Sequence, residues 1–203
     1  MSEGEFDGYI SITPESLAVE CMHRVATELD AAIHGESMRW WFVITDIDQA
    51  ITSALVAALS GTAGIGALNK EDQIAWLNYF EESRTDNKAR PPKNQKLTTL
   101  RELLSRAKDP ENMDRMGPPL LLDTKQESDI LRIHDFRNDL VHVKPVSWSL
   151  EVTGLPRMIG AAVKAIQKLF DLPPFRLHLE DEDIERMEIS LKSIEQTFQS
   201  MSR

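Results

Sequence analysis

A chain of 203 residues, of which 41% are hydrophobic, is long enough to build one domain with a real core. Its formal net charge of −10 argues against a protein that coats nucleic acid with its whole surface, because such proteins are basic. A local basic site stays compatible with that charge. Cys21 is the single cysteine, which excludes an intrachain disulfide and a zinc site made from several cysteines.

Apolar residues recur at three- and four-residue spacing along most of the chain, which predicts an all-α fold of six or seven helices in one domain. Thr13 followed by Pro14 is typical of a helix start, and Gly61 of a helix end. Residues 84–94 are expected to form a polar loop, and residues 146–152 alternate as a short extended segment would. The expected helices cover about residues 14–34, 38–60, 70–82, 97–107, 124–142, 155–170 and 182–201.

The most apolar stretch, residues 40–59, carries Asp46 and Asp48 in its middle, so we expect it to be too polar to span a bilayer. The acidic N-terminus lacks the cationic and apolar parts of a signal peptide. These features predict a cytoplasmic protein with no membrane partner. Asp46 and Asp48 point to different helix faces, which favours a partly solvated pair over a metal site. We expect no metal and no cofactor.

The expected helix over residues 124–142 ends in Arg137-Asn-Asp-Leu-Val-His142. At about 100° per residue, Arg137 falls within the apolar arc of this helix, so its charge needs a partner or an anion. Asn138 and His142 are four residues apart and are able to meet on one face. Pro145 ends the helix just beyond His142. A fixed cation beside a histidine, the usual proton-transfer group near neutral pH, suits metal-free phosphodiester cleavage.

The run from Arg137 to His142 is similar to the R-x4–6-H motif of the HEPN superfamily (higher eukaryotes and prokaryotes nucleotide-binding domains). The Pro-Val-Ser-Trp-Ser-Leu-Glu-Val-Thr-Gly-Leu-Pro that follows resembles the turn into the next helix of some bacterial members. The resemblance covers about residues 125–170. It implies an all-α domain that dimerises around the motif. In many members it implies a metal-independent endoribonuclease of toxin or phage-defence systems, whereas other members have lost catalysis and serve as binding modules.

Two function classes follow. In the first, Arg137 holds the phosphate of an RNA, Asn138 or Asp139 orients the histidine or the ribose, and His142 transfers a proton. The 2′-hydroxyl then attacks and leaves a 2′,3′-cyclic phosphate. A homodimer would supply two such histidines, and a toxin would have a neutralising, antitoxin-like partner. In the second class the motif stabilises the interface of a catalytically inactive binding or regulatory module. His134, on the same helix, either joins the site or is a structural histidine.

A cluster of cations interrupts the otherwise acidic chain. Cationic loops are most often simply solvated, but Lys88, Arg90 and Lys93 are also candidate contacts to an RNA backbone. If the protein handles RNA, we expect these three residues on the same face as the motif. The whole cluster consists of Arg84, Lys88, Arg90, Lys93, Lys96, Arg101, Arg106 and Lys108.

Overall fold

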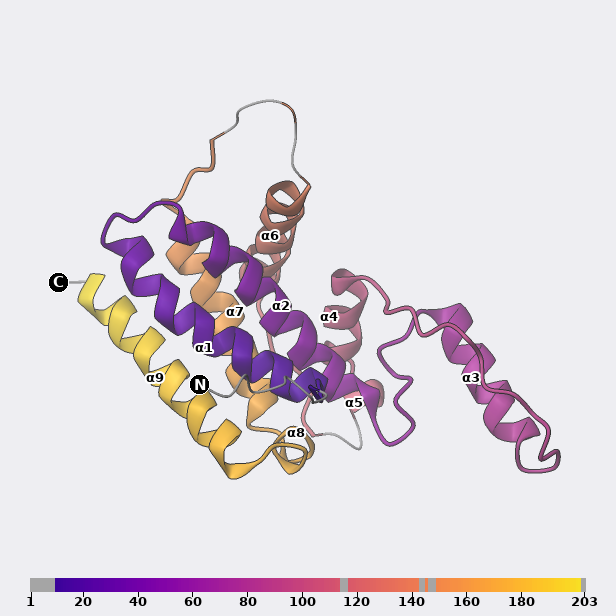
Figure 1. Ribbon diagram of the computed structural model, residues 1–203. Coiled ribbons are helices and arrows are strands. Elements are labelled where there is room, and N and C mark those ends of the chain that lie inside the picture. The colour runs from indigo at the N-terminus through magenta and orange to yellow at the C-terminus, as the bar shows by residue number, and fades with distance from the viewer. Residues whose placement is uncertain (1–9, 114–116, 143–144, 146–148, 202–203) are drawn as a thin grey trace, which may run out of the picture.

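The computed structural model describes residues 10–113, 117–142, 145 and 149–201 (Figure 1). Within these residues there are nine helices and no strand, so the predicted all-α fold is confirmed. Two single-turn helices, α5 (Pro110–Met113) and α8 (Pro173–Leu177), were not predicted, because so short a helix leaves no periodicity in the sequence. The longer helices are α1 (Pro14–Ile33), α2 (Arg39–Ser60), α3 (Lys70–Glu82), α4 (Leu100–Lys108), α6 (Thr124–Val141), α7 (Leu155–Phe170) and α9 (Asp181–Met201).

Local side-chain chemistry fixes several helix ends close to where the sequence predicted them. Thr13 and Ser16 form a reciprocal capping box at the start of α1, and Asp123 and Gln126 form another at the start of α6. Gly61 ends α2 with a φ of 57°, a conformation that favours glycine. The segment expected to be extended is not a strand where it is described, at residues 149–152, and its residues 146–148 lie outside the described part.

α2 is the central helix of the bundle (Figure 1). It packs against α1, α4, α6 and α7, and most of its residues are buried. By length and composition alone α2 is apolar enough to cross a membrane, but 78% of its most apolar stretch is buried inside the protein. Its apolar character is therefore accounted for by its place at the centre of the core.

α1 and α9 form one pair of helices on one side of α2, and α6 and α7 form another. α1 lies between α2 and α9, and its Met22, Val25 and Leu29 are fully buried. α6 and α7 pack against each other and against α2, burying Ile133 of α6 and Ile166 of α7. This packing places one face of α6 directly against α2. The residues of α6 that were singled out in the sequence are therefore positioned by the central helix.

α3 and the segment that returns from it project away from the bundle as an arm, residues 69–97 (Figure 1). The base of the arm is held by an isolated antiparallel bridge between Leu68 and Leu97. Arg106 of α4 strengthens this base, because its Nη1 donates to the carbonyl oxygens of Gly66 at 2.9 Å and Leu68 at 2.8 Å. None of the residues of α3 is buried, so the arm lies outside the core.

Candidate functional site

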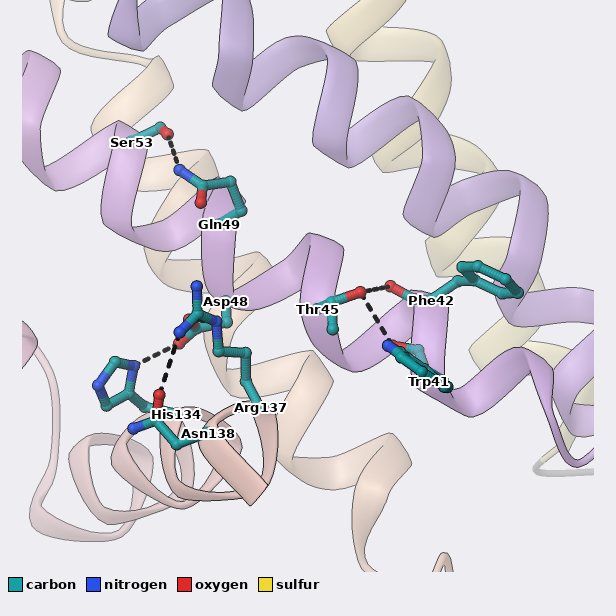
Figure 2. A network of polar contacts seen from close by, with 9 residues as sticks. All are labelled: Trp41, Phe42, Thr45, Asp48, Gln49, Ser53, His134, Arg137 and Asn138. Atoms are coloured by element: carbon teal, nitrogen blue, oxygen red, sulfur yellow. Dashed lines mark hydrogen bonds and ion pairs between the residues drawn. The ribbon is translucent and has the colours of Figure 1, made fainter. Parts of the chain in front are cut away.

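A buried carboxylate on α2 holds a histidine and an arginine of α6 next to each other (Figure 2). Oδ1 of Asp48 lies 2.9 Å from Nδ1 of His134. Oδ2 of the same carboxylate lies 3.6 Å from Nε of Arg137, which is an ion pair and too long for a hydrogen bond. His134 and Arg137 are three residues apart, so they share one face of α6. The three side chains form a polar cluster between α2 and α6 beside the predicted motif.

The cluster is buried on the side of α2 and open on the side of α6. The side chain of Asp48 is only 6% exposed, whereas those of His134 and Arg137 are each 34% exposed. Nη1 of Arg137 also donates to Oδ1 of Asn138 at 3.1 Å, which fixes the orientation of the guanidinium. An imidazole and a guanidinium are therefore held in place by protein groups while each keeps a surface that a ligand is able to reach.

Burial sets the electrostatics of Asp48. Loss of solvent raises the pKa of its carboxyl above the ordinary value of 3.8, and the charges of His134 and Arg137 only partly offset that rise. The carboxylate of Asp48 holds the imidazole of His134 through Nδ1. It also neutralises part of the charge of Arg137. The same group is thus able to orient a proton-transfer residue and to fasten α6 to α2.

The structure brings together only some of the residues predicted from the motif. Arg137 has the carboxylate partner that its place in the apolar arc demanded, and Asn138 contacts it. His142 is the exposed C-cap residue of α6, where its backbone N–H donates to the carbonyl of Asn138 at 3.1 Å. Among the described residues its side chain bonds to neither Arg137 nor Asn138. Within one chain, the histidine beside Arg137 is His134.

The expectation that Asp46 and Asp48 are partly solvated is wrong. They point to different faces of α2, as expected, but another helix covers each face. Both residues are buried, at 8% and 4% exposure. Oδ2 of Asp46 pairs with Nε of Arg24 of α1 at 3.1 Å, and burial raises the pKa of the Asp46 carboxyl. Each aspartate is thus one half of an interhelical ion pair.

Sequence reasoning did not assign Asp48 to the site, although a signal for it was present. Asp48 lies in the most apolar segment of the chain, and a carboxylate buried there needs a cation. The same reasoning predicted that Arg137 needs an anion. Because Asp48 and Arg137 each need a partner of opposite charge, they could have been matched to each other. The spacing of residues within each helix, however, gives no information about contacts between helices.

The candidate RNA-binding residues lie on the arm. Lys88, Arg90 and Lys93 are all exposed in the segment that returns from α3. Figure 1 shows this segment on the opposite side of α4 from α6. In a single chain these three cations are therefore not next to the Asp48 cluster, and an RNA would have to span the distance between them.

A groove of about 750 Å³ runs along the other side of α6. Arg132, Phe136 and Asp139 of α6 line it together with Arg157 of α7, and the guanidinium of Arg132 lies 4.5 Å from the centre of the Phe136 ring. At about 100° per residue, these α6 positions point roughly opposite to His134. The groove is thus separate from the Asp48 cluster.

Within the described residues, no group of three or more His, Cys, Asp or Glu side chains is arranged to hold a metal ion. Comparisons with known proteins found no matching family model, no matching curated protein and no matching solved structure. The HEPN resemblance therefore rests on the residues of its motif alone, and the function has to be argued from the geometry of the Asp48 cluster.

Proposed function

We propose that this protein is a metal-independent endoribonuclease of the HEPN type, with a site built around Asp48, His134 and Arg137. The observation that carries the proposal is the pairing of both α6 side chains with one buried carboxylate, while each stays 34% exposed. An imidazole and a guanidinium that are fixed side by side provide the two groups needed to transfer a proton and to bind a phosphate.

The proposed reaction uses the ribose hydroxyl as the nucleophile. Nδ1 of His134 faces Asp48, so Nε2 takes the proton from the 2′-hydroxyl, as in other carboxylate–histidine pairs. The 2′-oxygen forms a bond to phosphorus while the bond from phosphorus to the 5′-oxygen breaks. His142, at the end of the same helix, supplies the proton for the departing 5′-oxygen, and the product is a 2′,3′-cyclic phosphate.

Arg137 stabilises the charge that builds up on the phosphate oxygens. Its Nε faces Asp48 and its Nη1 faces Asn138, so the guanidinium is already oriented before a substrate arrives. Along the chain, Arg137 lies between His134 and His142. This order agrees with a phosphate bound between a base and an acid. Asp48 pairs with Arg137 within one chain, so a homodimer around α6 rests on the HEPN resemblance alone.

A second candidate function is a binding or regulatory module without catalysis. The observation that favours it is that Asp48 of α2 already pairs with His134 and Arg137 of α6. The three residues therefore join the two helices without any ligand. In addition, His142 contacts neither Arg137 nor Asn138 through its side chain among the described residues. Under this reading the motif stabilises the fold, and His142 is a surface residue.

An RNA-cleavage assay with the purified protein separates the two functions. The wild type is incubated with single-stranded RNA in the presence of EDTA, and the product ends are analysed for 2′,3′-cyclic phosphate. We expect His134→Ala, Arg137→Ala and His142→Ala each to lower the rate by about 10²–10⁴-fold. His178→Ala, at an exposed histidine after α8, is the matched control and should cleave like the wild type.

Circular dichroism must show that each variant keeps its helices, because Asp48 loses a partner in two of them. If the wild type cuts no RNA between about pH 6 and pH 8, the range over which histidine titrates, the binding module is the correct function. Equal cleavage by the wild type and by both His134→Ala and His142→Ala would also overturn the proposed chemistry.

A further inference from the structure

The outward face of the arm carries a short stripe of four exposed residues. Lys70, Ile74, Leu77 and Glu81 are spaced four, three and four residues apart on α3, so they lie in one row along the helix. Ile74 is 48% exposed and Leu77 is 49% exposed, although both are large and apolar. The row therefore has an apolar centre, a positive end at the bundle and a negative end at the tip.

The opposite face of α3 is already covered within the arm. Nε1 of Trp76 donates to the carbonyl of Asn94 in the returning segment at 3.1 Å. The rings of Trp76, Tyr79 and Phe80 contact one another on that side, with centroids 5.6 to 5.7 Å apart. The stripe thus points away from the returning segment. Figure 1 shows that the bundle does not cover it either, because the arm projects outward.

We propose that the stripe is the contact surface for a second copy of this chain, with two α3 helices lying antiparallel about a two-fold axis. When the stripe is reversed and laid against itself, its residues match in pairs. Ile74 faces Leu77 of the second copy, and Lys70 faces Glu81 of the second copy. Symmetry repeats each pair, so the contact has two apolar pairs at its centre and one ion pair at each end.

Charge decides between the two orientations and between kinds of partner. A parallel pair would place Lys70 against Lys70 and Glu81 against Glu81, which repels at both ends. The stripe also lacks the clustered positive charge that an RNA backbone requires, since Lys70 is its single cation and the other cations of the arm follow α3 in the chain. A self-complementary row with an apolar centre fits another copy of the same row.

The shape of the molecule permits this pairing. α3 starts at the bundle with Lys70 and ends near the tip of the arm with Glu82. Antiparallel arms therefore place the two bundles at opposite ends of a helix pair about 20 Å long. Two helices of this length form a small interface, so we expect a dimer with a dissociation constant in the micromolar range. The proposal stands on the arm alone and places the dimer contact on α3 in place of α6. The reaction proposed above uses residues of one chain and does not depend on this contact.

Sedimentation equilibrium of the full chain over low to high micromolar concentration tests the pairing. The wild type should shift from monomer to dimer, and Ile74→Asp combined with Leu77→Asp should stay monomeric. Lys70→Glu or Glu81→Lys alone should weaken dimerisation about tenfold, because each converts two attractive pairs into two repulsive ones. The double variant K70E/E81K should recover wild-type association, since the pairs are restored with reversed signs.

The single charge changes do not confound pairing with helix stability. A glutamate at the start of α3 and a lysine near its end both agree with the helix dipole, so neither weakens the arm. Glu82→Lys is the matched control, because Glu82 is exposed next to the stripe but outside the row. It should dimerise like the wild type.

Two results would overturn the proposal. One is a wild type that stays monomeric at high micromolar concentration, which would assign the stripe to a different protein. The other is a dimer that persists in the variant carrying Ile74→Asp and Leu77→Asp, which would place the interface elsewhere. Failure of K70E/E81K to recover association would overturn the antiparallel register.

Discussion

Asp48 of α2 and His134 of α6 are joined by a 2.9 Å contact between carboxylate and imidazole, across 86 residues of sequence. The second oxygen of the carboxylate faces Arg137, so one buried acid orients a histidine and an arginine of the same helix (Figure 2). This contact explains how α6 tolerates an arginine on its apolar side. It also ties the candidate chemistry of the motif to the position of the central helix.

Replacing Asp48 with alanine should destabilise the fold by about 2 kcal/mol, because the substitution removes a buried side chain together with the hydrogen-bond partner of His134. Urea unfolding followed by circular dichroism measures this loss. Asp135→Ala is the matched control, since Asp135 is an exposed carboxylate on α6. We expect it to change the free energy of unfolding by less than about 0.5 kcal/mol. Equal stability of both variants would show that the contacts of Asp48 with His134 and Arg137 contribute nothing to the free energy of unfolding.

The buried aspartates should also shape how stability depends on pH. Burial raises the pKa of Asp46 and of Asp48 above 3.8 in the folded chain, so the folded state holds these protons more tightly than the unfolded state. Their contribution to stability is therefore full below pH 3.8 and is lost as pH rises through the folded pKa values.

In Asp48→Asn this contribution of Asp48 is absent. The free energy of unfolding, measured between pH 3.8 and neutrality, should then increase more with pH, or decrease less, than in the wild type. An unchanged slope would mean that the ion pairs with His134 and Arg137 offset burial completely.

If the returning segment of the arm contacts an RNA backbone, reversing its charge should weaken binding. Lys88→Glu with Lys93→Glu is expected to lower affinity for a labelled single-stranded RNA and to reduce the salt slope by about two. Lys164→Glu with Lys192→Glu changes the same number of exposed charges on α7 and α9, and serves as the control. Fluorescence anisotropy at several salt concentrations gives both quantities. Similar losses of affinity in the two variants would show that the effect comes from the net charge of the protein and not from a contact between the returning segment and RNA.

Cys21 should be unreactive in the folded protein. Its side chain is buried in the core, and burial, together with the nearby charge of Asp46, raises the pKa of its thiol to about 12. A thiol reagent at mildly alkaline pH should therefore label Cys21 only when urea unfolds the chain, because the thiolate is the reactive form. Rapid labelling without urea would contradict the packing of α1 against α2.

The sequence by itself was sufficient to predict the seven longer helices. The ends of α1 and α6 depend on caps formed by residues three apart, Thr13 with Ser16 and Asp123 with Gln126. Such interactions are local, so their residues are readable along the chain. Local reasoning also showed that Arg137 needs an anion. It did not predict the outward course of α3, because the pattern of apolar residues indicates a helix and not what covers it.

Only the tertiary structure decided which residues meet. Arg137 pairs with Asp48, and His134 takes the place beside it that the motif suggested for His142. Both outcomes depend on how α6 is rotated and where it crosses α2, and those quantities are set by packing of the whole core. The burial of Asp46 and Asp48 has the same origin, because α1 and α6 cover two faces of α2 that look alike in the sequence. Periodicity fixes what lies on a helix face, and packing fixes what that face contacts.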